Sequence, residues 1–483
     1  MEPPVTAERR PALPAAGALL VALVLRLTLL ATTVDVPGDG PTRALAAYEW
    51  ARAPYWAISG WWPPGPLYLC GLVALVVPHP FLAIRILNAL AGTLTVAVLF
   101  LLARRVFGTT NAFVSAWLLA CLPLHIELSA SSLTESTFTL ALIAGIAALV
   151  SALHDGIHWS ILGVGLACFA YASMTRYEAW ALLPIVPLYV LVRTRRAIPT
   201  LVAALVLALF PVSWTAGNAA VYGDPWLGFT LAAHGAEVDG APSMTLPQAL
   251  GLVARRTTAE AGWYVPLAAA LGAMFAWHRR PNLAWHAERG LVVALWAMAW
   301  LLMLTFATMR GESLYARYLL FPLVLSLPLA ALPLTEHLHP SHRTAAALVL
   351  LAIASLPMAR FDARSRWVTR QEPAAMRALA TWLRASPYRD HPLIITDMGW
   401  QASYLGLFAP EIAPRQHIVS AWMPDGALAR IAAAPGPALV VTGDGEDPQR
   451  KRIESALRID LDDRPPVHTI GAIRIREVMR GSG

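Results

Sequence analysis

Charged side chains are scarce in this chain of 483 residues. Only 14% of the residues are Asp, Glu, Lys or Arg, while 57% are hydrophobic, and a soluble domain carries roughly 25% charged residues. This composition excludes an ordinary water-soluble protein and predicts a polytopic membrane protein. The formal net charge of +7 comes mostly from arginines between apolar runs. We therefore interpret it as a topology signal and expect no binding of nucleic acid.

Cysteine is almost absent, and the usual metal and nucleophile motifs are missing. Cys70, Cys121 and Cys168 each lie in an apolar run without paired spacing, which argues against a disulfide framework and against a thiolate metal site. The sequence has no His/Cys cluster with metal-ligand spacing and no G-x-S-x-G motif. The sequence therefore identifies no cofactor with certainty, and two carboxylates could hold a divalent ion.

Long apolar runs are what the chain has in abundance. A membrane span needs about 20 apolar residues. Segment 65–78 is apolar but short and is bounded by prolines, so we predict a juxtamembrane or re-entrant helix there. Eleven runs are predicted to span the membrane: 12–34, 82–104, 110–128, 135–153, 158–175, 178–192, 198–216, 261–277, 290–309, 314–334 and 343–359.

The orientation follows from basic residues near the ends of these runs. Run 12–34 follows Arg9-Arg10 and is too long for a signal-peptide core, so we predict an uncleaved anchor with a cytoplasmic N-terminus. Arg104-Arg105 and the arginines at 193–196 then lie inside. The outside regions are the loops 35–81 and 217–260 and the tail. A full span at 65–78 would move the arginine clusters outside.

The tail differs from the rest in composition. Residues 374–385 have helical apolar spacing, 393–396 and 438–442 have the composition of short buried strands, and 470–478 alternates as a strand does. We therefore predict a small extracytoplasmic α/β domain at 361–483. It follows an α-helical transmembrane domain at 1–360.

Acidic residues beside the predicted spans are the first candidates for chemistry. Asp35 and Asp39 follow the first run, and Glu135 opens a later one. Carboxylates near a membrane are costly, and a carboxylate can serve as a general base. Asp39 is the preferred base, with Asp35 as a supporting or alternative residue. The structural alternatives are that Asp39 caps a helix at 42–52, and that Glu135 lies in the first turn of a helix capped by Thr134 or Ser132.

Arginines at the outer ends of spans are the second group of candidates. Arg176, Arg317 and the nearby Arg310 could hold a phosphate, because a guanidinium binds phosphate through two hydrogen bonds and stays charged. Tyr315 lies beside Arg317. Snorkelling toward lipid head groups is the alternative, and Arg176 could also form a structural pair with Glu178.

Two tryptophans stand before a pair of prolines in the first outside loop. Trp61 and Trp62 precede Pro63-Pro64. They belong either to the aromatic belt at the membrane surface or to the wall of a substrate cavity.

Five stretches of the first part of the chain form an ordered set: Trp62-Pro63-Pro64-Gly65-Pro66-Leu67-Tyr68, Arg85–Leu90, Leu101–Gly108, Leu122-Pro123 and Leu133-Thr134-Glu135. In this order, they resemble the C-type (GT-C) polytopic glycosyltransferases. The branch they resemble contains the protein O-mannosyltransferases and the lipid A aminoarabinose transferases (glycosyltransferase families 39 and 83). The resemblance covers about 35–195, and Tyr315–Pro322 resembles a later segment of the family.

The resemblance implies an acidic catalytic residue in the first external loop, here Asp39, and a second acid in the next, here Glu135. It also implies a polyprenyl- or dolichyl-phosphate sugar as donor and reaction on the outer face. In many members a second acid or a Tyr-rich helix follows the first-loop acid. Here Gly40 follows instead, so the choice between Asp39 and Asp35 stays open.

We therefore predict an inverting glycosyltransferase of the bacterial inner membrane. It would transfer a sugar to an acceptor hydroxyl on a protein, lipid or glycan. Asp39, Glu135 and Arg317 are expected to converge in one extracytoplasmic pocket. The alternative is a transporter or flippase of lipid-linked sugars. Such proteins often carry inverted repeats and helices broken at mid-membrane, whereas the polar residues here gather at outer helix ends.

Overall fold

The computed structural model describes residues 12–311 except 37, 78, 232–242, 263 and 279–282. It also describes 314–337 and, within 367–480, all but 371–372, 392–393, 398–400, 419–427, 429–430, 434–435 and 444–447. The chain forms two compact units. The first comprises Met1–Thr32, Trp56–Pro66 and Arg85–Trp367, and the second comprises Thr33–Tyr55, Leu67–Ile84 and Val368–Gly483.

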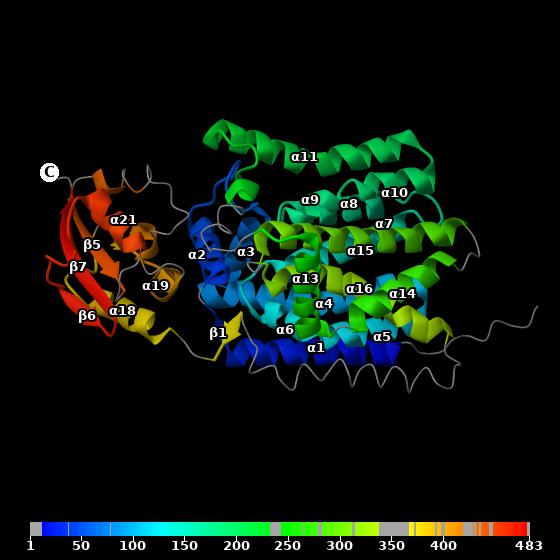
Figure 1. Cartoon of the computed structure of the whole chain (residues 1–483), viewed down its shortest axis with the longest axis horizontal. Helices are drawn as coiled ribbons and strands as arrows, with labels where there is room; N and C mark the ends of the chain where they lie inside the picture. The colour runs from blue at the N-terminus through cyan, green and yellow to red at the C-terminus, as the bar shows by residue number, and fades with distance from the viewer. Residues whose placement is uncertain are drawn as a thin grey trace, which may run out of the picture. The chain divides into compact units, whose positions relative to one another are not determined.

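The first unit is a helical bundle. Its helices are α1 (Ala12–Thr32), α4 (Pro80–Phe107), α5 (Thr109–Ala120), α6 (Pro123–Ala130), α7 (Glu135–Ala152), α8 (Trp159–Ser173), α9 (Glu178–Leu182), α10 (Ile185–Thr194), α11 (Ala197–Tyr222), α13 (Leu246–Ala261), α14 (Tyr264–His278), α15 (Leu283–Arg310), the 3-10 helix η2 (Ala316–Leu319) and α16 (Leu320–His337). In Figure 1, α7, α8, α10 and α15 run along one direction, and α8 packs against both α7 and α11.

Six helical stretches among the described residues are long and apolar enough to cross a membrane, or seven if the bent pair α5 and α6 is one span. The chain is therefore a multi-pass membrane protein, as predicted. Ten of the eleven predicted runs coincide with helices, and 343–359 lies outside the described residues. The predicted number of eleven also includes runs that form shorter or broken helices, and the run 343–359. Helix α8 has 15 residues, about 22 Å, and the run 178–192 divides into α9 and α10 at Pro184, since proline disrupts a helix interior.

Glycines allow close approach between helices of the bundle. A Cβ atom on Gly145 of α7 would lie 3.0 Å from the Phe169 ring of α8, and one on Gly272 of α14 would overlap the backbone carbonyl of Leu329 in α16. In lipid, helices associate largely by such close packing, because hydrocarbon tails are as apolar as leucine. The α7–α8 and α14–α16 pairs therefore form rigid parts of the bundle.

The second unit contains α2 (Asp39–Arg52), α3 (Gly65–Val76), and a ribbon in which β1 (Val34–Asp35) pairs antiparallel with β2 (Val368–Thr369). Its five-stranded sheet has the order β4-β3-β5-β7-β6. The strands are β3 (Ile394–Thr396), β4 (Gln416–Ile418), β5 (Gly436–Thr442), β6 (His468–Ile470) and β7 (Ile473–Arg480). Strands β3, β4 and β5 are parallel, while β7 runs antiparallel to both β5 and β6.

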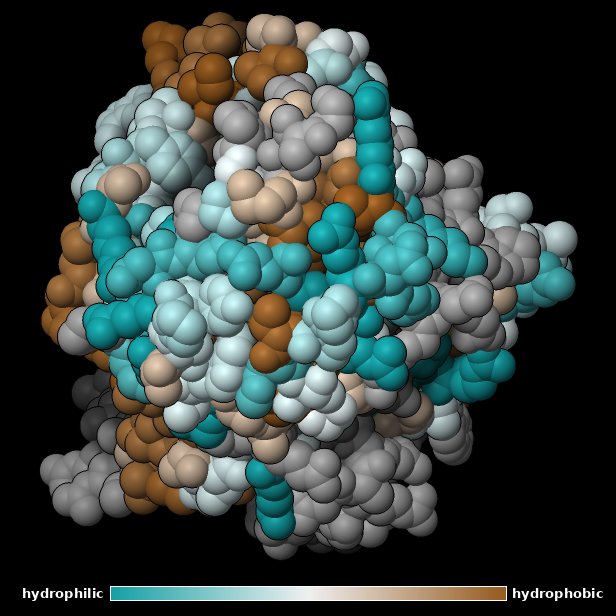
Figure 2. All heavy atoms as spheres, turned by 90° about the vertical axis from the view of Figure 1, so that its left-hand side faces the viewer, coloured by the Kyte–Doolittle hydropathy of each residue, from teal (hydrophilic) through white to brown (hydrophobic). Residues whose placement is uncertain are grey.

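Alternate residues of the central strands fill two separate cores. Leu439 and Val441 pack with α18 (Ala374–Ala385) and α19 (Ala402–Phe408), whereas Ala438 and Val440 pack with α21 (Pro448–Leu457). This is the period-two pattern of a sheet covered on both faces. The surface over this sheet, which faces the viewer in Figure 2, is largely hydrophilic.

The predicted α/β character of the tail is confirmed. The predicted helix 374–385 is α18, and the predicted strands correspond to β3, β5 and β7. The second unit also includes the segments 33–55 and 67–84, most of which lie in the predicted outside loop 35–81. The short helix predicted at 65–78 is α3, with 12 residues. The other predicted loop, 217–260, contains the end of α11 and most of α13, and its residues 232–242 lie outside the described residues.

Candidate functional site

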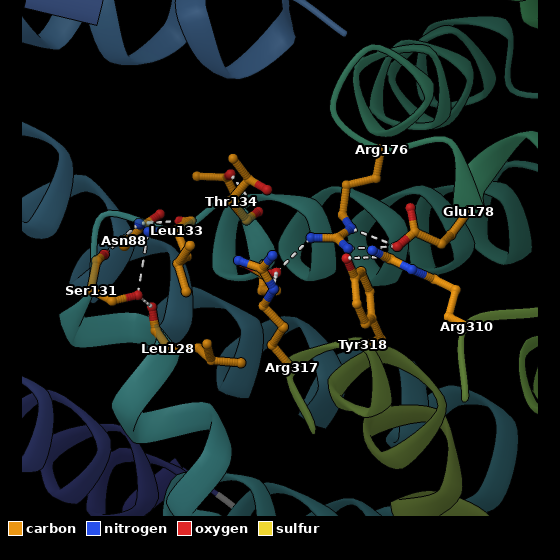
Figure 3. A network of polar contacts seen from close by, with 12 residues as sticks. Asn88, Leu128, Ser131, Leu133, Thr134, Arg176, Glu178, Arg310, Arg317 and Tyr318 are labelled. Carbon is orange, nitrogen blue, oxygen red and sulfur yellow. Dashed lines mark hydrogen bonds and ion pairs between the residues drawn. The ribbon is translucent and has the colours of Figure 1, made fainter. Parts of the chain in front are cut away.

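Helix α4 fixes the polar segment that leads into Glu135. The side-chain amide of Asn88 donates hydrogen bonds to the carbonyls of Ser131 (2.7 Å) and Leu133 (2.5 Å), and Arg85, three residues earlier, donates to the carbonyl of Ala130 (2.5 Å). Figure 3 shows the Asn88 contacts. Residues three apart share one face of a helix, so a single face of α4 determines where α7 begins.

Arg176 joins two glutamates from different helices. It lies between α8 and α9, and its Nη1 donates to Glu135 Oε1 at 2.5 Å. Its Nε and Nη2 donate to Glu178 Oε1 at 3.0 and 2.5 Å. The predicted Arg176–Glu178 pair is therefore present and extends to Glu135. The exposed fractions of the side chains are 12% for Arg176, 4% for Glu135 and 12% for Glu178.

Arg317 approaches the same carboxylate from η2. Its Nε lies 3.7 Å from Glu135 Oε1, which is an ion-pair distance but too long for a hydrogen bond. The guanidinium carbon lies 5.3 Å from the ring centroid of Tyr315 and 5.1 Å from that of Trp367. Cation–π attraction to these rings stabilises a charge that is largely removed from water.

Tyr318 lies at the centre of the three arginines (Figure 3). The guanidinium carbons of Arg176, Arg317 and Arg310 are 5.0, 5.4 and 5.8 Å from its ring centroid. Arg310 Nη1 also donates a hydrogen bond to the Tyr318 hydroxyl at 3.0 Å. Arg310 ends α15, where a cation is favoured by the helix dipole. One aromatic ring therefore holds three cations close together.

The described part of the cluster holds three arginines and two glutamates. Among the described residues no group donates a hydrogen bond to Glu135 Oε2. Several guanidinium groups beside an available carboxylate oxygen suit a ligand with one anionic group and neighbouring hydroxyls.

Trp61 is connected to this region through its backbone. The hydroxyl of Tyr177, the residue after Arg176, donates to the Trp61 carbonyl at 3.1 Å, and Trp214 Nε1 donates to that hydroxyl at 3.0 Å. Trp61 and Trp62 are both half-buried. The structure therefore fixes the Trp61 backbone beside α9, while the choice between aromatic belt and cavity wall stays a prediction.

The two aspartates belong to the second unit. Asp35 is 1% exposed and lies in β1. Asp39 is half-buried and is the first residue of α2, with Gly38 at the N-cap position. The alternative in which Asp39 caps this helix is therefore wrong. A cap by Thr134 on α7 is also wrong, since that side chain makes no cap hydrogen bond. The convergence of Asp39 with Glu135 and Arg317 stays a prediction.

Asn88 and Tyr318 were not among the site residues predicted from the sequence. Glu127 Oε1 accepts a hydrogen bond from the backbone N–H of Trp367 at 2.5 Å and so fixes a ring that contacts Arg317. A polar residue inside an apolar run, as Asn88 is, often has a functional or structural role, and this pattern could have identified Asn88 from the sequence. Three or more His, Cys, Asp or Glu side chains do not gather as metal ligands anywhere in the described residues.

A second polar cluster marks the other end of the same helices. Glu288 Oε1 lies 2.9 Å from His154 Nδ1 and 4.0 Å from Arg193 Nη2. In α15, Glu288 and Arg310 are separated by about 33 Å at 1.5 Å per residue. Glu135 begins α7 and His154 follows its end. The arginine-rich cluster and the Glu288 cluster therefore lie at opposite ends of the bundle.

Part of the chain matches a known family. Residues 61–214 match the model of a family described as dolichyl-phosphate-mannose-protein mannosyltransferase. YycA of Bacillus subtilis (strain 168), named as a mannosyltransferase, is 26% identical over 148 residues. That match covers 30% of this chain and 22% of YycA, so this chain spans about a fifth of the relative's length.

Two solved structures resemble almost the whole chain. ArnT from Cupriavidus metallidurans, bound to undecaprenyl phosphate, has a TM-score of 0.62 and 15% identity over 97% of this chain and 98% of its own. The oligosaccharyltransferase AglB from Archaeoglobus fulgidus, in complex with an inhibitory peptide and a dolichol-phosphate, has a TM-score of 0.56 and 11% identity over 96% and 73%. At these identities the likeness establishes the fold.

Proposed function

We propose that this chain, a member of the GT-C superfamily in its fold, is a membrane glycosyltransferase. It moves a sugar from a polyprenyl-phosphate donor to an acceptor hydroxyl. The observation that carries this proposal is the grouping of Arg176, Arg310 and Arg317 around Tyr318. A phosphodiester is the anionic group of such a donor, and planar guanidinium groups match its oxygens.

The reaction assigns one task to each group of residues. Asp39 accepts the proton of the acceptor hydroxyl, whose oxygen then bonds to the anomeric carbon of the sugar. The bond between that carbon and the phosphate oxygen breaks with inversion, and the polyprenyl phosphate leaves with the electron pair. The arginines stabilise the charge that develops on the leaving phosphate. Glu135 Oε2 orients a hydroxyl of the sugar or of the acceptor.

The distribution of charge supports a site on the outer face. Arg104, Arg105 and Arg193 lie at the ends of α4 and α10, and Arg193 joins the Glu288 cluster at the end of the bundle opposite to Arg317. Basic loops are retained in the cytoplasm. This orientation exposes the arginine-rich cluster to the extracytoplasmic side. Solved relatives hold undecaprenyl phosphate or dolichol-phosphate, which supports the donor class.

The decisive experiment is purification of the full chain in mild detergent, followed by mass spectrometry of the lipids that remain bound. We expect a prenyl-phosphate sugar, which would also name the donor. Bulk phospholipid alone would contradict the donor assignment. Binding of added undecaprenyl phosphate can be measured in parallel. Arg310→Met should weaken it, and Arg104→Met, which removes an exposed arginine of α4, should not.

The Asp39→Asn variant tests the base. It replaces a carboxylate by an amide of the same shape, so the variant should insert and bind undecaprenyl phosphate normally while losing sugar transfer. Full transfer by Asp39→Asn together with an inactive Asp35→Asn would reassign the base to Asp35. A wild-type protein that binds the donor and moves it across vesicles without transferring sugar would instead identify a flippase.

A further inference from the structure

We propose that α19 of the C-terminal sheet region positions the segment that carries Asp39, with Ser403 and Tyr404 as the positioning residues. This inference rests on the proposed function, since it assigns a role in that reaction to a part of the chain that carries no catalytic residue. All the contacts that support it lie within the second unit.

Two hydrogen bonds, one buried and one partly buried, connect α19 to the residues on either side of Asp39. The hydroxyl of Tyr404, a fully buried side chain, donates to the backbone carbonyl of Asp35. The hydroxyls of Ser403 and Thr42 lie 2.6 Å apart. Asp39 therefore stands between two points that are held by consecutive residues of one helix.

The Ser403 contact continues to the residue next to Asp39. Thr42 Oγ1 is 3.1 Å from the carbonyl of Gly38 and donates to it. A hydroxyl has a single proton, so the arrangement that satisfies both contacts has Ser403 donating to Thr42. This chain of hydrogen bonds runs from α19 through Thr42 to Gly38, and Gly38 precedes Asp39.

One face of α2 continues the contact with the C-terminal region. Thr42, Leu45 and Arg52 are spaced as neighbours on one helix face. A Cβ atom on Gly406 of α19 would lie 2.8 Å from a methyl group of Leu45, and Arg52 Nη1 donates to the carbonyl of Pro410 at 3.2 Å. At the other end, Asp35 pairs with Val368 across the β1–β2 ribbon. The segment is thus attached along its whole length.

Such attachment matters for a general base because a shift of about 1 Å in a catalytic group can cost on the order of a hundredfold in rate. Helix α2 alone is short, and isolated helices below ~12–15 residues are marginal in water. The alternative role for a C-terminal domain, recognition of the acceptor, would leave the motion of α2 independent of Ser403 and Tyr404.

The test uses the full chain in detergent with Tyr404→Phe and Ser403→Ala, each of which removes one hydroxyl. Ser403→Thr restores a hydroxyl. Tyr388→Phe and Thr381→Ala are matched controls, since those hydroxyls lie in the same unit and are exposed. Amide hydrogen exchange of residues 38–52, the Kd for undecaprenyl phosphate, and the kcat of transfer with the donor identified in the purified protein are measured for every variant.

We expect faster exchange in 38–52 and a kcat lower by about tenfold or more in Tyr404→Phe and Ser403→Ala, with an unchanged Kd. Exchange in α18 should stay at the wild-type rate, and Ser403→Thr should recover most of the kcat. Exchange and kcat equal to those of the two controls would overturn this inference alone. Absence of transfer in the wild-type protein would overturn the proposed function and, with it, the role assigned to α19.

Discussion

Removal of Arg176 offers a sharp test of the charged cluster. In Arg176→Met, Glu135 loses its 2.5 Å hydrogen bond but keeps Arg317 at 3.7 Å. Glu178, with a side chain that is 12% exposed, loses both bonds from Arg176. Breaking a buried ion pair from one side costs about 3–5 kcal/mol, because the other charge remains buried. We expect a loss of this size in the free energy of unfolding.

The assay is thermal unfolding in detergent, followed by the fluorescence of the 18 tryptophans. The second variant, Arg176→Met with Glu178→Gln, removes the unpaired charge and should recover about half of the loss. Arg104→Met serves as a control for the removal of a cation. A single variant as stable as the control would refute the view that these charges compensate one another.

Three further predictions concern ligand binding and packing. Arg310→Met should weaken binding of undecaprenyl phosphate about tenfold, since a charge ~5 Å from a phosphate contributes at most about 3 kcal/mol at an effective dielectric constant of 20. Added salt should narrow the difference in Kd between Arg310→Met and Arg104→Met. Asn88→Ala should leave two buried carbonyls unpaired and cost about 1–3 kcal/mol, measured by thermal unfolding; an unchanged unfolding temperature would contradict the role given to α4. Gly272→Ala should fail to accumulate in membranes, because its methyl group would overlap the Leu329 carbonyl; normal expression would show that α14 and α16 can separate.

The sequence predicted helices and strands well where a regular pattern was present. The boundaries of α18 were predicted at 374–385 because its apolar residues recur at helical spacing. Hydropathy does not register where prolines such as Pro184 divide a run into two helices. Nor does it register that a run such as 158–175 gives a helix of only 15 residues.

The candidate site was predicted residue by residue but not as an arrangement. Glu135, Arg176 and Arg317 each stand at a helix end, and costly charges in such places were visible without a structure. Arg176 and Arg317 meet at the ring of Tyr318. This meeting depends on how α7, α9 and η2 pack, and no local sequence pattern encodes that packing. The attachment of α2 to α19 was also invisible, because it joins residues 361 positions apart.

The hydrogen bond from Tyr404 to Asp35 spans 369 positions of the chain, and this separation has a consequence for biosynthesis. At translation rates of ~5–20 residues per second, roughly 20–70 seconds pass between the synthesis of one partner and the other. Throughout that interval the N-terminal helix of the nascent chain can already enter the membrane, while Asp35 and Thr42 still lack their hydrogen-bond partners on α19. The segment around Asp39 therefore reaches its final arrangement only after synthesis has passed residue 404.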